Sequence, residues 1–142
     1  MSLPIVTEKV KAAIESGKYD FIVLNIANGD MVGHTGNFNA AVQAMEWVDK
    51  SLGEILAVLK EQNGEALIIA DHGNIEQMAI NGMPSTTHTT YPVPCIYFGP
   101  RKVAIVNGTL ADVAPSILHL LDLKVPREMT GKSLIDFALT NS

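Results

Sequence analysis

The sequence predicts an α/β domain with a mainly parallel sheet flanked by helices, and three observations support this prediction. A short apolar run rich in β-branched and aromatic residues occupies residues 21–26, and a second apolar run occupies residues 66–70. Between them lies a long segment in which apolar residues recur at helical spacing. This succession is typical of a right-handed crossover between parallel strands. The 142 residues, 47% of them apolar, are enough for one core, so we expect a single α/β domain over residues 1–142.

Two helices are expected in the N-terminal half. Residues 4–16 have apolar side chains at helical spacing, and Gly17 marks the end of the pattern. The second helix ends near Asn63-Gly64, and its apolar face is formed by Ala41, Met45, Val48, Leu52, Ile55, Leu56 and Leu59. Residues 27–39, which precede it, are rich in Gly and Asn and are predicted to form a loop.

The C-terminal half adds shorter elements. A third strand is expected at residues 93–98, and a short fourth strand at residues 102–106. Thr109 followed three residues later by Asp112 is typical of a helix cap, and it predicts a helix over residues 110–121. Pro115 either breaks this helix or starts its regular part. A last short helix is expected at residues 133–139.

The charge and composition exclude several classes of partner. Ten basic residues stand against fifteen acidic ones, and they form no cluster that would follow a nucleic-acid backbone. No run of about 20 apolar residues is present to cross a membrane. One cysteine, Cys95, cannot form an internal disulfide, so we expect a cytoplasmic protein. Met1-Ser2-Leu3 has no features of a secretory signal and is interpreted as a possible cloning scar.

Carboxylate and imidazole groups follow the predicted strands. Asp30 and His34 lie just past the first strand, Asp71 and His72 end the second, and His88 precedes the third. Ligands of parallel α/β sheets gather beyond the carboxyl ends of the strands, so these residues should face one crevice. Asp and His together suit divalent ions such as zinc or manganese. A spacing of four residues in a helical turn would let Asp30 and His34 share an ion.

Simpler interpretations of each piece remain open. Asp30 would also suit a solvated loop or the start of a helix. Asp71-His72-Gly73-Asn74 would suit a turn in which the aspartate supplies a cap and the glycine a positive φ. His88 taken alone would suit an exposed loop. His119, between leucines in a predicted helix, is interpreted as a structural histidine. The hypothesis of a metal site rests on the combination of three separate loops.

Three strings of the sequence resemble one enzyme family, the cofactor-independent phosphoglycerate mutases. The strings are Asn25-Ile26-Ala27-Asn28-Gly29-Asp30-Met31-Val32-Gly33-His34-Thr35-Gly36, Ala70-Asp71-His72-Gly73-Asn74, and Thr87-His88-Thr89-Thr90-Tyr91-Pro92-Val93-Pro94. The resemblance runs from about Tyr19 to the end of the chain. The Asp-His-Gly piece recurs across the alkaline phosphatase superfamily, whereas the string around Asp30 and His34 is specific to the mutases. Gly29 departs from the family, where proline or cysteine is more usual.

The resemblance implies a fold, a reaction and a set of ligands. It implies the C-terminal part of the metal-binding, phosphatase-like domain of an enzyme with two divalent ions, usually manganese. Asp30, His34 and His88 would hold the first ion, and Asp71 and His72 would contribute to the second. The family interconverts 3-phosphoglycerate and 2-phosphoglycerate in glycolysis through a metal-activated phosphoserine, without 2,3-bisphosphoglycerate. The expected partners are the phosphorylated substrate and the missing N-terminal part of the same enzyme.

The resemblance also implies what the chain lacks. No serine here matches the family's nucleophile motif, and the only arginines are Arg101 and Arg127, too few for the family's anion pocket. We therefore expect a piece of the enzyme that holds at most one ion well and is inactive alone. The uncovered sheet edge predicts self-association. Two alternatives stay open: another phosphatase, phosphodiesterase or sulfatase of the superfamily, and a metal-binding module without a reaction of its own.

Overall fold

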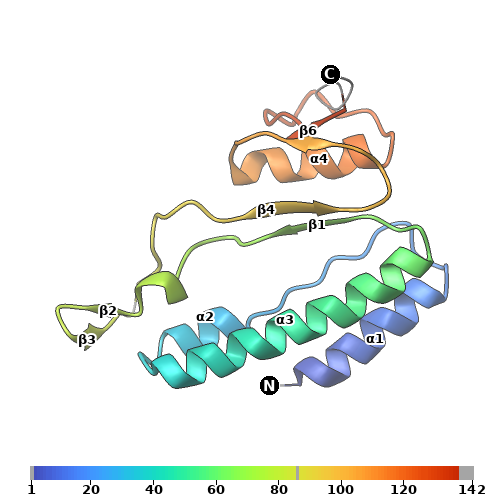
Figure 1. The fold of residues 1–142 in the computed structure, drawn as a ribbon. Helices are drawn as coiled ribbons and strands as arrows, with labels where there is room; N and C mark the ends of the chain where they lie inside the picture. Colours follow the sequence, from blue (N-terminus) through green and yellow to red (C-terminus); the bar gives the residue numbers. More distant parts are fainter. Residues whose placement is uncertain (1, 86, 138–142) are drawn as a thin grey trace. The chain divides into compact units, whose positions relative to one another are not determined.

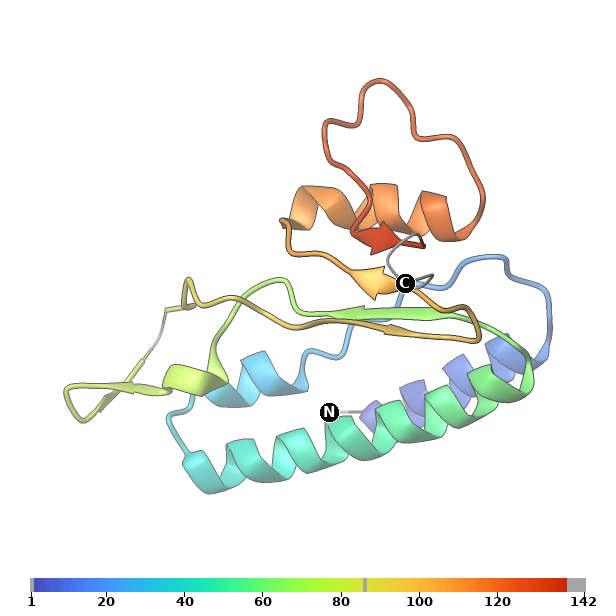
Figure 2. The same cartoon turned by 45° about the horizontal axis from the view of Figure 1, so that its top comes forward.

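The computed structural model describes residues 2–85 and 87–137 and divides the chain into two compact units. The first unit comprises Met1–Gly64 and His72–Val93, and the second comprises Glu65–Asp71 and Pro94–Ser142. Helices dominate the first unit, whereas the described residues of the second form short strand pairs and one α-helix (Figures 1 and 2). Within the described ranges, no helix has the length and hydropathy needed to cross a bilayer.

Two long helices form the body of the first unit. Helix α1 (Leu3–Glu15) packs along α3 (Phe38–Glu61), and the two lie side by side in Figures 1 and 2. The buried face of α3 comprises Ala41, Ala44, Ser51 and Ile55. Lys11 of α1 lies 3.6 Å from a carboxylate oxygen of Glu54 in α3, which adds an ion pair at the edge of the contact. Both helices confirm the sequence prediction, including the end of α3 before Asn63.

A short helix lies where a loop was predicted. Helix α2 (Asn28–Gly33) occupies the first half of residues 27–39 and packs against α3. Packing on a long neighbour overrides the poor helix propensity of its glycines and asparagine. Asn37 then caps α3, because its side chain accepts a hydrogen bond of 3.0 Å from the Ala40 amide. The prediction was wrong for residues 28–33.

The first unit also contains a small hairpin that the sequence analysis missed. A 3₁₀ turn, η1 (Ile75–Gln77), leads into β2 (Ala79–Ile80), which pairs antiparallel with β3 (Met83–Pro84). The two residues between the strands, Asn81 and Gly82, have φ values of 53° and 78°. Two consecutive residues with positive φ are typical of the tight type I′ hairpin turn, for which Asn-Gly is the preferred sequence.

No strand is assigned at residues 21–26, although the sequence predicted one there. The segment alternates between exposed and half-buried side chains, and Val23 is 79% exposed. Alternation of this kind is typical of an extended chain, but an extended segment is a β-strand only when it is hydrogen-bonded to a neighbouring strand. Within the described ranges, no such pairing is made by these residues.

The strand pairs of the second unit are antiparallel. Strand β1 (Ala66–Ile69) pairs with β4 (Cys95–Phe98), and β5 (Ala104–Ile105) pairs with β6 (Ile135–Asp136). The α/β class is confirmed, but the expected parallel sheet is corrected, since every pair among the described residues is antiparallel. The described chain between β1 and β4 holds only η1 and the small hairpin. Parallel neighbours are usually joined by a crossover that contains an α-helix, and these described residues form none.

The helix predicted after Thr109 is present, but the last predicted helix is not. The turn η2 (Leu110–Asp112) begins with the Thr109–Asp112 capping box and leads into α4 (Val113–Leu120). Pro115 lies in the first turn of α4, where its missing N–H removes no helical hydrogen bond. Residues 135–136 form β6 and not part of a helix, which corrects that prediction, and residues 138–139 lie outside the described residues.

A hydrogen-bonded group of polar side chains, Glu65, Tyr97 and Arg101, lies in the second unit. Arg101 donates through Nε to Glu65 at 2.5 Å and through Nη2 to the other carboxylate oxygen, and Nη2 also donates to the Leu120 carbonyl at 2.6 Å. The Tyr97 hydroxyl donates to the same glutamate. Burial by itself would raise the pKa of Glu65, but the hydrogen bonds from Arg101 and Tyr97 outweigh it and hold the pKa below the ordinary 4.5.

Replacing Arg101 with methionine is expected to lower the free energy of unfolding at neutral pH by about 1–3 kcal/mol, because Glu65 loses its charged partner. The pH dependence should change as well. A carboxyl group with a depressed folded pKa stabilises the fold above its unfolded pKa, and this stability is lost as the pH falls through the folded pKa. The variant should lack the stability that ionised Glu65 gives the parent. Its free energy of unfolding, measured with urea at each pH, should therefore fall less steeply than that of the parent between about pH 5 and pH 3. The same dependence of unfolding free energy on pH in both proteins would contradict the proposed role of the Arg101–Glu65 pair.

Candidate metal centre

Helix α2 places the first two candidate ligands on one side of a single turn. Asp30 lies inside α2, and His34 is the residue that ends it, with its amide bonded to the Asp30 carbonyl at 3.3 Å. Residues four apart in a helix face the same way. The imidazole Nε2 of His34 accordingly lies 3.2 Å from Oδ1 of Asp30. The sequence predicted this pair from its spacing.

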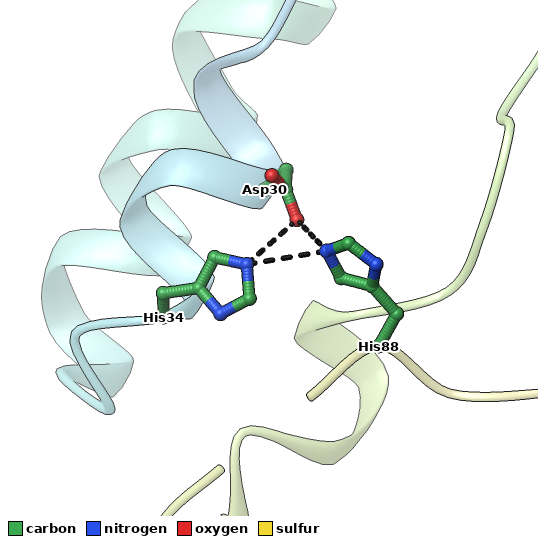
Figure 3. A group of neighbouring side chains, drawn as sticks. All are labelled: Asp30, His34 and His88. Carbon is green, nitrogen blue, oxygen red and sulfur yellow. Dashed lines mark hydrogen bonds and ion pairs between the residues drawn. The ribbon is translucent and has the colours of Figure 1, made fainter. Parts of the chain in front are cut away.

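The third candidate ligand comes from a segment more than fifty residues further along the chain. His88 follows the β2–β3 hairpin, and its Nε2 lies 3.2 Å from Asp30 Oδ1 and 3.3 Å from His34 Nε2. Figure 3 shows the three side chains pointing toward one another. The three atoms form a nearly equilateral triangle. His88, which could have been an ordinary exposed loop histidine, thus joins Asp30 and His34 as the sequence analysis expected.

The shape of this triangle fits a divalent cation. Ligands about 2.0–2.1 Å from a tetrahedral ion stand about 3.3–3.4 Å apart, and neighbouring ligands of an octahedral ion with similar bonds stand about 3.0 Å apart. The observed edges of 3.2 and 3.3 Å agree with a ligand face of either kind. One carboxylate oxygen and two ring nitrogens that converge at this distance would repel through their lone pairs unless a proton or a cation lay among them. Asp30, His34 and His88 therefore have the chemistry and the spacing of a group that could hold a divalent ion.

A buried amide supports this donor set. Asn74 is only 7% exposed, and its Nδ2 donates to Asp30 Oδ1 at 2.6 Å and lies 3.2 Å from His34 Nε2. Burial by itself would raise the pKa of Asp30, but the Asn74 hydrogen bond and the nearby imidazoles outweigh it and lower the pKa below its ordinary 3.8. Asp30 is thus kept ionised, as a metal ligand must be. The sequence pattern at Asn74 indicated only a turn, and no local signal pointed to this contact with Asp30.

His72 lies beside the same centre. Its ring stacks on that of His88, with centroids 3.5 Å apart and planes inclined by 12°, and its Nε2 lies 3.9 Å from Asp30 Oδ1. Asp71 follows β1 in the second unit, whereas His72 begins the second segment of the first unit. The ligand pair predicted for a second ion is thus divided between the two units. That second set stays a prediction.

Two further residues, His119 and Cys95, lie away from the centre. His119 lies in α4, where its Nδ1 is 2.8 Å from the Ser133 hydroxyl and its ring meets Phe137 edge to face. Those contacts fit the structural role expected for it. Cys95 is half-buried in β4, and burial raises the pKa of its thiol. A raised pKa keeps the thiol protonated and unreactive, in line with a core position.

The comparisons with known proteins agree with the metal chemistry of this centre. Residues 1–125 match the metalloenzyme superfamily. The 2,3-bisphosphoglycerate-independent phosphoglycerate mutase of Cellvibrio japonicus is 57% identical over 138 residues, which are 95% of this chain and 27% of the relative. A second such mutase, from Methanosarcina barkeri, is 59% identical over 95% of this chain and 26% of its own length.

A solved structure gives the same result at the level of the fold. Crystal structures of Leishmania mexicana phosphoglycerate mutase at low cobalt concentration superpose with a TM-score of 0.85 and 34% sequence identity, covering 96% of this chain and 28% of that one. The chain spans about a quarter of the length of the relatives it matches, and the resemblance seen in the sequence is confirmed. Because the family's pattern matches residues 1–125, most of the chain, the chain belongs to the metalloenzyme superfamily.

Proposed function

We propose that this chain is the metal-holding part of a cofactor-independent phosphoglycerate mutase, a cytoplasmic glycolytic enzyme that interconverts 3-phosphoglycerate and 2-phosphoglycerate. The observation that carries the proposal is the triangle of Asp30, His34 and His88, with edges of 3.2–3.3 Å. The 57% identity to the Cellvibrio japonicus mutase over 95% of the chain supports the choice of reaction. Manganese is the proposed ion.

The residues of the centre have distinct parts in this function. A divalent ion bound there would lower the pKa of a coordinated hydroxyl and screen the charge of phosphate oxygens. Asp30 supplies the negative charge of the site, and His34 and His88 supply neutral nitrogen ligands. Asn74 orients the Asp30 carboxylate through its 2.6 Å hydrogen bond. Asp71 and His72 are proposed as ligands of a second ion.

The chain by itself is proposed to be inactive in this reaction. None of its serines matches the nucleophile motif of the mutases, and its arginines are limited to Arg101 and Arg127. A substrate with a phosphate and a carboxylate needs more cationic groups than these, particularly on a chain whose formal charge is −5. The nucleophile and the anion pocket are proposed to come from the rest of a longer enzyme.

A chimaera tests the proposal. The stretch of the Cellvibrio japonicus mutase that matches this chain would be replaced by the chain itself, and 2-phosphoglycerate formation would be followed in an enolase-coupled assay. We expect an active chimaera whose activity requires His34, and no turnover by the 142-residue chain alone. A chimaera that folds and binds metal but is inactive would contradict the proposed reaction, and turnover by the isolated chain would contradict its proposed dependence on further residues.

Self-association of the isolated chain is a further part of the proposal. Phe21 and Val23 are 52% and 79% exposed in an extended segment, and exposed apolar side chains of this kind favour association. We expect light scattering to give a mass above that of one chain, rising with concentration, and Val23→Lys to shift the protein toward the monomer. A monomer at high concentration in the unsubstituted protein would contradict this expectation.

A further inference from the structure

The metal centre is assembled from segments distant in sequence, so something must fix the distance between them. Asp30 and His34 belong to α2, Asn74 precedes η1, and His88 follows the β2–β3 hairpin. The segment of Asn74 and that of His88 meet in one antiparallel bridge, in which the Thr89 amide donates to the Gly73 carbonyl at 2.8 Å. A single backbone bridge fixes the separation of the two segments at one point but leaves them free to rotate about it.

A glutamate supplies the second tie between these segments. The Oε2 atom of Glu76 accepts a hydrogen bond of 2.8 Å from the backbone N–H of Asn74, and its Oε1 atom accepts one from the Thr89 hydroxyl. Asn74 is the residue that donates to Asp30, and Thr89 is the residue next to His88. The Glu76 carboxylate therefore connects Asn74, which supports the ligand Asp30, with Thr89, which is next to the ligand His88.

The backbone around this glutamate leaves no spare room. A Cβ atom at Gly73 would lie 2.0 Å from Glu76 Oε1 and 2.2 Å from Thr89 Oγ1, so the contact requires a glycine there. Gly73 is buried, and it comes directly before Asn74. The side-chain oxygens of Glu76 and Thr89 therefore meet in the space that the missing side chain of Gly73 leaves open.

We infer that Glu76 is a positioning residue of the metal centre, which holds Asn74 and Thr89 together and so sets the distance between Asp30 and His88. The inference rests on the proposed metal-binding function. Glu76 touches none of the three ligands in this arrangement, and it acts through Asn74 and Thr89. Residues that orient metal ligands in this way typically contribute about 10–100-fold to metal affinity.

The opposing interpretation is that Glu76 only stabilises the local turn. Glu76 is exposed, and exposed hydrogen-bonded carboxylates add little to the stability of a fold. The two roles therefore predict different observables. A structural glutamate changes the unfolding of the metal-free chain, whereas a positioning glutamate changes metal affinity and the spectrum of the bound ion.

Three variants of the 142-residue chain separate these roles. Glu76→Ala removes both hydrogen bonds, whereas Glu76→Gln keeps an oxygen for the Asn74 amide and an amide group that can donate to Thr89 Oγ1. Glu46→Ala removes an exposed carboxylate from α3 and is the matched control. Cobalt(II) is the probe, with its affinity measured by competition against a chromophoric chelator and its coordination by visible absorption. Thermal unfolding in EDTA measures the stability of the metal-free proteins.

The expected result is a cobalt affinity about 10–100-fold lower in Glu76→Ala with an altered visible spectrum, while Glu76→Gln and Glu46→Ala stay within about 3-fold of the parent. Parental affinity and spectrum in Glu76→Ala, with only its thermal unfolding changed, would overturn the inference. An equal loss in Glu76→Gln would also overturn it, because charge and not geometry would then be the cause. If the parent chain binds no cobalt, the proposed metal function itself fails. If the parent binds cobalt and Glu76→Ala binds it equally well, only the inference about Glu76 fails.

Discussion

Replacing His34 with alanine is expected to weaken divalent-metal binding by the chain at least about 100-fold, more than the loss typical for residues that merely support a ligand. His34 Nε2 is one corner of the three-atom set, 3.2 Å from Asp30 Oδ1 and 3.3 Å from His88 Nε2. Its removal leaves two protein ligands, too few to retain an ion against water and chelators. Titration with manganese or cobalt under chelator competition measures the change.

His119→Ala is the matched control for this substitution. It removes the same side chain from α4, where His119 contacts Ser133 and Phe137 and not the three-ligand set. Its metal affinity should equal that of the parent chain. Equal affinities for His34→Ala and the parent would show that the ion is held elsewhere, and a loss confined to His119→Ala would mean that the metal centre has been misplaced.

Substituting Gly33 with alanine is expected to disturb the site through packing. A Cβ atom at Gly33 would lie 2.2 Å from Asn74 Oδ1 and 2.8 Å from Ile75 Cγ2, so α2 and the Asn74 segment would have to separate. Overpacking of this kind costs about 1–3 kcal/mol of unfolding free energy. Because Asn74 also donates to Asp30, metal affinity should fall by about 10-fold or more. Urea unfolding of the metal-free protein and metal titration measure the two effects.

Gly53→Ala is the control for helix propensity. Gly53 lies inside α3, and a Cβ atom there would meet nothing within 4 Å. Alanine should therefore stabilise the fold by about 0.5–1 kcal/mol and leave metal affinity unchanged. If Gly33→Ala is as stabilising as Gly53→Ala, the close approach of α2 and Asn74 does not exist in solution.

The sequence predicted the parts of this molecule that depend on local patterns. The two long helices follow from apolar periodicity, and the Thr109–Asp112 cap follows from its side-chain chemistry. The Asp30–His34 pair follows from its spacing of four residues. Each of these patterns has its cause within a few residues along the chain.

The missed features depend on contacts distant in sequence. The direction of strand pairing is decided by the path of the chain between β1 and β4, and no local pattern reports that path. The support of Asp30 by Asn74 joins residues 44 positions apart. The hairpin at Asn81-Gly82 is the exception among the missed features, since Asn-Gly is itself a local signal for a tight turn.

The most direct test of the central claim is X-ray absorption spectroscopy of the cobalt-loaded 142-residue chain. We expect one ion per chain in the parent, with two imidazole ligands visible as multiple scattering and the remaining ligands as oxygen, and at most one imidazole per ion in the His34→Ala variant and in the His88→Ala variant. An ion coordinated by oxygen alone in the parent, or two imidazole ligands retained in either variant, would contradict the assignment of Asp30, His34 and His88 as its binding site.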